Sequence, residues 1–457
     1  MNILIALTII GVIAMLSEIL RFRKVLYPLA LTGLAAGLVL CVMEWGSSIR
    51  YFHDMMFMDN YAIAFSMVMI GTTFIWFLLN PAYLRNHEHE ADYTALITFS
   101  LAGAVVMVSF ADLTMLFLGI EILSIAMYIM AASNKMELRS NESGFKYFML
   151  GAFATGFLLF GIALIYGVTG TFNLQELAGF VSANKANLPG MFYAGLLLMI
   201  VGLTFKISAA PFHFWAPDVY EGAPTPVTAY MATVVKTAAF AAFLRLFMTC
   251  FSGIADWWAP MLAIFSAISM LAGNILAVYQ KSMKRMLAYS SISHAGYMLM
   301  AIVAMNQNSD GALLLYTAAY AIGSISIFTL LVSMTSNGNE MINSLRGFSS
   351  VNKIPAILIT ITMLSLAGIP PVAGFFAKYY VFLSAIESGY TWLVLVGVLS
   401  SLIGVYYYFR IIITMFQPAD RESTQIQFSN SQNAVLWLTV ILSLILGFMP
   451  GFLTGSI

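Results

Sequence analysis

The segment FKISAAPFHFW, residues 205–215, follows the apolar run LLLMIVGL and contains a lysine, a proline and a histidine within about two helical turns. Lys206 and His213 can each take up and release a proton, which is the chemistry of a proton relay. In a low-dielectric environment the charged form of a lysine is disfavoured, and a nearby carboxylate stabilises it. A buried lysine can therefore switch between charged and neutral forms as a carboxylate approaches or withdraws.

Two more ionisable residues lie deep within apolar segments. Glu121, in MLFLGIEILSIAMYIM, is about ten residues into its segment and is the only deeply placed carboxylate. Lys236 lies about ten residues beyond Pro226, roughly 15 Å along a helix and too deep to reach water. A charge at such a depth costs at least about 2.5–3.5 kcal/mol on insertion scales. We therefore favour a functional role for both residues over a buried ion pair or an interhelical hydrogen bond.

The composition defines the class of protein that must position these residues. Of 457 residues, 61% are hydrophobic and 9% are charged, whereas about a quarter are charged in soluble proteins. The chain is thus predicted to be an integral membrane protein, with its N-terminal segment retained as the first span. Its net charge of zero indicates no nucleic-acid surface. Cys41 and Cys250 are the only cysteines, which excludes a cysteine-ligated iron–sulfur cluster, and no nucleotide-binding or metal-binding motif is present.

Apolar runs of about 17 to 25 residues predict an all-α polytopic membrane protein with about fourteen transmembrane helices. They begin near residues 2, 26, 58, 93, 112, 143, 191, 224, 257, 284, 309, 354, 390 and 433. The predicted division is helices 1–3 in residues 1–92, a first repeat in 93–250, a second repeat in 257–416, and helix 14 in 417–457.

Basic residues in the loops predict the orientation. With the first loop in the cytoplasm, only Arg50 and Lys185 fall in outside loops, against twelve in inside loops. The twelve are Arg21, Arg23, Lys24, Arg85, Lys135, Arg139, Lys281, Lys284, Arg285, Arg346, Lys353 and Arg421. This bias and the even number of spans predict that both termini face the periplasm.

The remaining six basic residues lie within spans: Lys146, Lys206, Lys236, Arg245, Lys378 and Arg410. Arg245 and Arg410 are in the last turns of their predicted helices, where we expect them to snorkel to the interface. Glu18 is expected to pair with Arg21 at the end of the first span. Asp112 is expected to cap the N-terminus of the fifth helix.

Proline breaks occur in two segments that each carry a lysine. The first is expected at residues 207–211, beside Lys206, and the second at residues 367–372 in SLAGIPPVAGFFAKYY, shortly before Lys378. A single proline kink in a membrane helix would be weak evidence, but the two breaks are five helices apart. They predict two five-helix units, helices 4–8 and 9–13, which are inverted relative to each other because five is odd.

Three runs resemble a known family: FKISAAPFHFWAPDVYEGAPTPVTAYMATVVK, YQKSMKRMLAYSSISHAGYM and LSLAGIPPVAGFFAKYYVF. They closely resemble the antiporter-like membrane subunits of respiratory complex I, and the resemblance covers nearly the whole chain. It implies fourteen helices with inverted repeats and a role in redox-coupled proton translocation. Relatives with glutamate on the twelfth helix, or with a long lateral helix at the end, are different subunits, and neither feature occurs here.

The resemblance also implies roles for individual residues. The residues that it implies for proton translocation are Glu121, Lys206, Lys236 and Lys378. Secondary relay positions are Lys146 and His294, and we add His213 beside the first break. In the expected relay, Glu121 switches the charge of Lys206, and the path continues through Lys236 and His294 to Lys378, with waters bridging the longer gaps.

The same resemblance implies the surroundings of the chain. Its partners would be the other membrane and peripheral subunits of complex I, above all neighbouring antiporter-like subunits, in the inner membrane of a bacterium. NADH, FMN, iron–sulfur clusters and quinone would be used by those partners, and this chain would bind no cofactor or metal.

Three alternatives stay open at this point. The nearest is a subunit of a multi-subunit sodium/proton antiporter, which ion-flux assays would distinguish. The second is an independent transporter of an organic substrate, which is disfavoured because the embedded residues form a line of titratable groups without an evident ligand pocket. The third is a structural spacer with incidental buried charges, which substitution of Lys236 would test.

Overall fold

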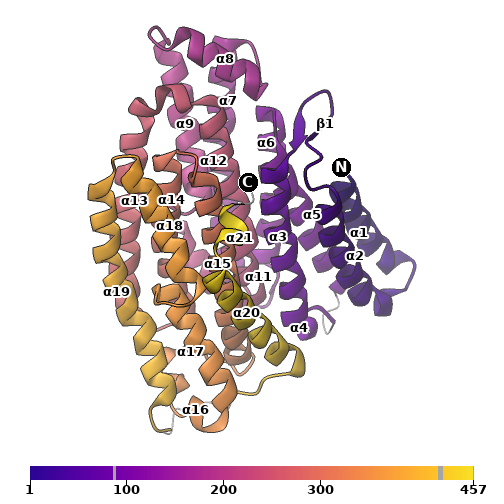
Figure 1. Ribbon diagram of the computed structural model, residues 1–457. Helices are drawn as coiled ribbons and strands as arrows, with labels where there is room; N and C mark the ends of the chain where they lie inside the picture. Colours follow the sequence, from indigo (N-terminus) through magenta and orange to yellow (C-terminus); the bar gives the residue numbers. More distant parts are fainter. Residues whose placement is uncertain (86–88, 420–425, 456–457) are drawn as a thin grey trace. The chain divides into compact units, whose positions relative to one another are not determined.

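The structure is a computed structural model that describes residues 1–85, 89–419 and 426–455 (Figure 1). Arg421 and the C-terminal residue Ile457, both used in the predicted orientation, lie outside the described residues. Backbone groups in lipid must form their hydrogen bonds within the chain, and the described residues are accordingly helical apart from one short hairpin and the loops.

Twelve helical segments of the described chain are long and apolar enough to cross a membrane. The predicted spans near residues 191 and 354 are present as shorter apolar helices, Gly190–Lys206 and Lys353–Ala367. These two helices are short because the proline-containing breaks end them. The prediction of an all-helical polytopic membrane protein is therefore confirmed.

The contacts divide the chain into two compact units, and the first contains residues 1–208 and 234–262. Its elements are α1 (Asn2–Ile19), α2 (Arg23–Met43), β1 (Ile49–Tyr51), β2 (Met56–Met58), α3 (Asn60–Leu79), α4 (Pro81–Arg85), α5 (Glu90–Ser109), α6 (Leu113–Ala131), α7 (Leu138–Thr169), α8 (Leu174–Asn184), α9 (Gly190–Lys206), α12 (Lys236–Cys250) and η2 (Ser252–Ile254). The strands β1 and β2 form an antiparallel hairpin in which Arg50 is opposite Phe57. This hairpin has no counterpart among the elements predicted from the sequence.

The second unit contains residues 209–233 and 263–456. Its elements are α10 (Trp215–Gly222), α11 (Thr225–Tyr230), most of α13 (Ala255–Val278), α14 (Met283–Ala304), α15 (Ser309–Thr335), η3 (Ile342–Leu345), α16 (Phe348–Val351), α17 (Lys353–Ala367), α18 (Ala373–Glu387), α19 (Thr391–Phe416), α20 (Asn430–Phe448) and α21 (Gly451–Thr454). The π-helical turn η1 (Met231–Val235) connects α11 to α12. These units are groups of contacting residues, whereas the predicted repeats are defined by topology, so the two divisions need not coincide.

Small residues let neighbouring helices approach closely within each unit. A Cβ atom added to Gly103 of α5 would lie 2.8 Å from the backbone of α6, and one added to Gly273 of α13 would lie 2.5 Å from the backbone of α14. Packing through small residues is the usual means of helix association in membranes, because lipid tails provide no hydrophobic driving force between helices.

Both predicted helix breaks are confirmed. Helix α9 ends at Lys206, Ser208 has a φ of +55°, and the next helix begins only at Trp215. Helix α17 ends at Ala367, Gly368 has a φ of +85°, and α18 begins at Ala373. The prolines lie in these breaks, where the missing N–H costs no helical hydrogen bond.

Helix caps follow the predicted pattern in part. Asp112 caps α6 by accepting a hydrogen bond from the Thr114 backbone N–H at 2.8 Å, as predicted. The predicted partner of Glu18 was wrong, because its carboxylate pairs with Arg23 at the start of α2. Arg23 begins the following helix, so its side chain lies beside the end of α1, whereas Arg21 lies in the turn with a positive φ.

Candidate functional site

Lys206 is the last residue of α9 and is buried, with 8% of its surface exposed. Its Nζ donates a hydrogen bond to Ser124 Oγ in α6 at 2.6 Å, and Ser124 Oγ donates in turn to the Ile120 carbonyl. A cation at the C-terminal end of a helix is favoured by the helix dipole. The break after Lys206 thus creates a site where a buried ammonium is stabilised by neutral groups.

Glu121 lies three residues before Ser124 on α6, one helical turn from the hydroxyl that accepts from Lys206. The described residues contain no ion pair between Glu121 and Lys206 within 4.0 Å, and the buried Oε1 atom of Glu121 has no hydrogen-bond partner among them. Ser124 therefore holds the direct contact to Lys206. Sequence reasoning did not identify Ser124, although its spacing of three from Glu121 places both on one side of the helix.

Lys236 directly follows the π-helical turn η1 and is 3% exposed. It is the twelfth of the 26 residues in the span Thr225–Cys250, and every residue of this span up to Phe247 is buried. Single π-helical turns interrupt the regular hydrogen-bond pattern and are frequent at functional sites. The apolar pattern predicts Lys236 at the centre of a span, as observed, but the π-helical turn has no simple sequence signal.

Arg245 does not snorkel, contrary to the prediction. Its side chain is 7% exposed and forms an ion pair with Asp59, the N-cap residue of α3. Its guanidinium also lies over the Tyr61 ring, 4.8 Å from the centroid. The prediction failed because α12 continues to Cys250, which leaves Arg245 more than a turn from the helix end and beside a carboxylate.

Lys378 of α18 reaches across the second break. Its Nζ donates hydrogen bonds to the Ala367 carbonyl at 3.0 Å and to Ser401 Oγ at 2.9 Å. The Nζ atom also lies 5.0 Å from the centroid of the Tyr297 ring, a cation–π contact. Gly368 leaves room for this side chain, because a Cβ atom there would lie 2.9 Å from Lys378 Cδ.

His294 is buried in α14 between tyrosines. Its Nδ1 is 2.8 Å from the Tyr316 hydroxyl and its Nε2 is 3.2 Å from the Tyr408 hydroxyl. Its ring centroid lies 6.0 Å from that of Tyr297, which also contacts Lys378. The structure therefore brings His294 and Lys378 to the same cluster, through one tyrosine.

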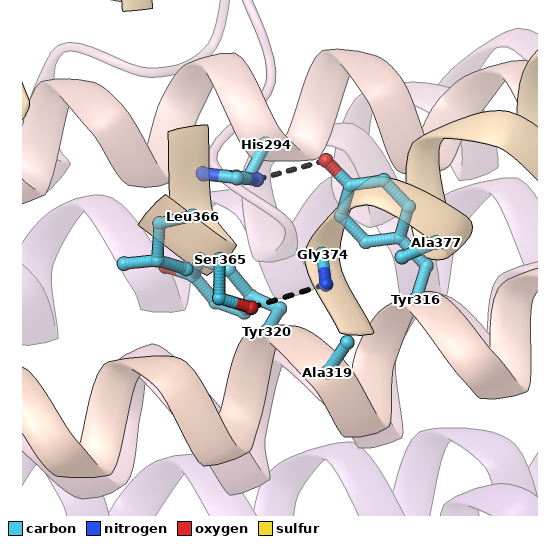
Figure 2. A pocket seen from close by; sticks show the side chains of 8 residues that line it. All are labelled: His294, Tyr316, Ala319, Tyr320, Ser365, Leu366, Gly374 and Ala377. Atoms are coloured by element: carbon cyan, nitrogen blue, oxygen red, sulfur yellow. Dashed lines mark hydrogen bonds between the residues drawn. The ribbon is translucent and has the colours of Figure 1, made fainter. Parts of the chain in front are cut away.

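A small cavity of about 10 Å³ adjoins His294. It is lined by Tyr316 and Tyr320 of α15 and by Ser365 of α17 and Gly374 of α18, which flank the second break (Figure 2). Ser365 Oγ accepts a hydrogen bond from the Gly374 N–H at 3.1 Å. The cavity has room for about one water molecule among these polar groups.

The other predicted relay residues lie in different environments. Lys146 pairs with Glu142 at 2.7 Å, and its side chain is 38% exposed on α7. His213 lies in the segment between α9 and α10 and is buried, with no hydrogen-bond partner for its Nδ1 among the described residues. Arg410, predicted to snorkel, is half-buried and donates to the carbonyls of Val278 and Gln280 at 3.2 Å.

Lys284 was assigned to an inside loop, but it lies in the first turn of α14 and is 6% exposed. Its Nζ donates to the carbonyls of Glu221 and Ala223, at the C-terminal end of α10. The adjacent Arg285 forms ion pairs with Asp218 at 3.0 Å and with Glu221 at 2.7 Å. These two residues therefore dock α10 onto α14.

Among the described residues, no group of three or more histidine, cysteine, aspartate or glutamate side chains could hold a metal ion. The sites defined above consist of lysines, a histidine, a carboxylate and hydroxyl groups. Such groups bind and release protons.

Comparisons with known proteins agree with this picture. Residues 111–404 match a family described as NADH:quinone oxidoreductase/Mrp antiporter, TM. The chain is 40% identical to NADH-quinone oxidoreductase subunit N of Cytophaga hutchinsonii, over 99% of this chain and 98% of that protein. It is 42% identical to subunit N of Flavobacterium johnsoniae, over 92% of each.

A solved chain from respiratory complex I of Thermus thermophilus with bound aureothin has a TM-score of 0.86 and 30% identity, covering 99% of this chain and 98% of that chain. The fold and the buried lysines thus define an antiporter-like membrane subunit. Within that class, the chain belongs to the family of NADH-quinone oxidoreductase subunit N. The resemblance identified from the sequence is confirmed.

Proposed function

We propose that protons cross this subunit by way of the lysines that lie at its helix discontinuities. As a member of the subunit N family, the chain is a proton-translocating, antiporter-like membrane subunit of complex I. Two groups of residues would carry the protons. The first is Glu121, Lys206 and Lys236 in one unit, and the second is His294 and Lys378 in the other.

One observation carries this proposal: Lys206, Lys236 and Lys378 each lie where regular helical hydrogen bonding stops. Lys206 ends α9, Lys236 follows the π-helical turn, and Lys378 donates to the last carbonyl of α17. Irregular backbone inside a membrane is tolerated where it lines a polar cavity or an ion site. Three structural charges would not need to share this position.

The hydrogen-bond partners of these lysines suit proton transfer. Lys206 donates to a serine hydroxyl, and Lys378 donates to a serine hydroxyl and a carbonyl. A direct carboxylate partner would hold the positive charge in place, whereas neutral acceptors stabilise the ammonium less and allow its proton to leave. Glu121 would modulate Lys206 from one helical turn further along α6. Moving one charge costs about 2.3 kcal/mol per 100 mV of membrane potential, which a change of this kind in the lysine environment can match.

Lys146 and His213 are proposed as secondary positions. Lys146 has a carboxylate partner one helical turn away, and the outer face of α7 that carries it also exposes Phe145 and Phe153. We propose that a neighbouring antiporter-like subunit covers this face, which would bring Lys146 into a buried environment in the complex.

The finer topology belongs to the same proposal. We propose fourteen spans with inverted repeats of helices 4–8 and 9–13, and both termini in the periplasm of a bacterial inner membrane. The two broken helices and the loop charges support this arrangement. NADH, FMN, iron–sulfur clusters and quinone would be used by the partner subunits, whose electron transfer would drive this chain.

The test is to replace Lys206, Lys236 and Lys378 singly by methionine in the intact complex and measure protons pumped per NADH oxidised in membrane vesicles. Lys281→Met is the matched control, because Lys281 is an exposed lysine of the loop before α14. We expect each buried-site variant to assemble and to pump less than the control. Pumping equal to the control in all three variants would remove the lysines from the proton path.

A second measurement addresses the ion that is moved. The matched family model covers both NADH:quinone oxidoreductase and Mrp antiporter chains, so the full-length relatives decide the assignment. Vesicles that contain the complex should acidify on NADH addition without sodium present. A strict requirement for sodium would favour the antiporter function instead.

A further inference from the structure

Asn274 is a buried polar residue in the C-terminal part of α13, with 1% of its surface exposed. Its Nδ2 lies within hydrogen-bond distance of the Ser400 hydroxyl at 2.6 Å, the Met270 carbonyl at 3.0 Å and the Tyr297 hydroxyl at 3.2 Å. Its Oδ1 accepts a hydrogen bond from the Tyr407 hydroxyl at 2.9 Å. Asn274 thus joins α13 to α14 and α19 with every polar atom engaged.

The first branch of this cluster leads to Lys378 through Tyr297. The Tyr297 hydroxyl contacts Asn274 at one end of the side chain, and the ring faces the Lys378 ammonium at 5.0 Å. A cation–π contact depends on the position of the ring relative to the cation. A hydrogen bond that holds the hydroxyl therefore also holds the ring against the ammonium.

The second branch leads to Lys378 through α19. Asn274 contacts Ser400, and the next residue, Ser401, accepts the hydrogen bond from Lys378 Nζ at 2.9 Å. Ser400 Oγ also donates to the Met270 carbonyl of α13 at 2.8 Å. These contacts fix the rotation of α19 at this level, and the rotation decides where Ser401 points.

Gly404 supports the same arrangement. A Cβ atom added there would lie 3.3 Å from Asn274 Oδ1 and 3.7 Å from the Tyr407 hydroxyl. The glycine leaves the space in which the amide oxygen and the tyrosine hydroxyl meet. The site is therefore shaped around the Asn274 side chain.

We propose that Asn274 is a positioning residue for proton transfer at Lys378. Through its contacts with the Tyr297 hydroxyl and with Ser400, it keeps the Tyr297 ring and the Ser401 hydroxyl in place against the Lys378 ammonium. This inference rests on the proposed function of Lys378. Asn274 does not touch Lys378 and carries no proton itself. Fully satisfied buried polar networks fix one arrangement of the helices that contribute to them, which is what such a role requires.

The pH dependence of pumping distinguishes positioning from a purely structural role. The Tyr297 ring and the Ser401 hydroxyl stabilise the protonated form of Lys378. If either group is no longer held in place, Lys378 takes up its proton only at a more acidic pH. Neighbouring helices bring these titratable groups around the site: His294 and Tyr297 of α14, Tyr316 and Tyr320 of α15, and Tyr407 and Tyr408 of α19. Helices α17 and α20 contribute uncharged groups there, the Ala367 carbonyl and Ser443.

The experiment replaces Asn274 by leucine, which is similar in size and forms no hydrogen bond, in the intact complex. Ser326→Ala is the matched control, because Ser326 is fully buried and bonds Thr362 across α15 and α17 at 2.8 Å. We expect Asn274→Leu to pump about half as many protons per NADH, or fewer, and to shift the pH profile of pumping by about half a unit or more toward acid. The control should keep the profile of the unmodified complex. An Asn274→Leu profile equal to that of the control would overturn the proposal.

Two further variants keep the result decisive. Lys378→Met alone tests the proposed function: if it lowers pumping while Asn274→Leu does not, only the positioning role fails. If Asn274→Leu prevents assembly, Tyr297→Phe takes its place, because it keeps the ring and removes the hydroxyl that Asn274 holds. The same shift toward acid in Tyr297→Phe supports the proposal, and an unchanged profile overturns it.

Discussion

The ammonium of Lys378 donates a hydrogen bond to the carbonyl of Ala367, the last residue of α17, across the break that separates α17 from α18. At the other break, Lys206 is itself the last residue of α9. In sequence the lysine precedes the proline in the first segment and follows it in the second. In both cases the cation lies at the C-terminal end of the first half-helix, where free carbonyls and the helix dipole favour it.

Gly368→Ala should disturb Lys378 directly. The new Cβ atom would lie 2.9 Å from Lys378 Cδ, and the φ of +85° would be strained for alanine by about 1 kcal/mol. We expect a loss of both stability and pumping, measured by thermal denaturation and proton uptake. Gly389→Ala is the control, since Gly389 has a φ of +83° and open space around it. It should lose stability to a similar degree and keep its pumping.

Lys236 should be replaceable without loss of assembly but not without loss of pumping. Methionine keeps much of the volume and cannot carry a proton, so Lys236→Met should lower protons pumped per NADH. Lys236→Arg keeps the charge but holds its proton at any physiological pH, so it should fail as well. If the lysine were only structural, methionine would be neutral or stabilising. Normal pumping in the assembled methionine variant would contradict the relay.

Arg245→Met should be among the more destabilising single changes in the first unit. It leaves the Asp59 carboxylate at the start of α3 without its guanidinium partner. The Asp59 side chain is 25% exposed, so the loss should be at or below the lower end of the roughly 3–5 kcal/mol that breaking a fully buried pair costs. Adding Asp59→Asn should recover part of the loss, because asparagine also caps helices well. The exposed pair of Arg50 and Asp54, 3.9 Å apart, provides the comparison: Arg50→Gln should cost less than about 1 kcal/mol. Thermal denaturation of the complex measures both, and equal losses would argue against a buried pair.

Thiol labelling can test the orientation. Ser182 in α8 and Ser336 in the turn after α15 are both exposed, in connections between spans that are predicted to lie on opposite sides of the membrane. The native Cys41 and Cys250 are buried. A membrane-impermeant thiol reagent added to intact spheroplasts should label Ser182→Cys and leave Ser336→Cys unlabelled until the membrane is opened. The reverse pattern would invert the predicted topology.

The class of fold could be predicted from the sequence because lipid leaves few options: long apolar runs must be helices. The breaks were predictable for the same reason, since Pro211, Pro370 and Pro371 cannot continue a helix. The hairpin of β1 and β2 could not be foreseen, because it is short and lies between spans. The π-helical turn before Lys236 could not be foreseen either, because no residue pattern distinguishes it from a regular α-helix.

The site was predictable only as far as rare residue types allow. A lysine or glutamate in an apolar run is conspicuous, so Glu121, Lys206, Lys236 and Lys378 could be named. Serines, tyrosines and asparagines are common in membrane helices, and their roles depend on which helices pack together. Ser124, Ser401 and Asn274 could therefore be found only from the structure. Arg245 was conspicuous in the sequence, but its predicted environment was wrong. Its partner Asp59 lies 186 residues away in sequence, so the ion pair could not be foreseen.

The order of the two units along the chain has a genetic consequence. The chain passes between them after residues 208, 233 and 262, so the piece that contains α10 and α11 belongs with helices synthesised later. Lys284 and Arg285 of α14 hold this piece through its residues Asp218, Glu221 and Ala223. Dividing the gene at any single point would leave one product with a segment of the other unit. Two half-length genes could not each encode one unit.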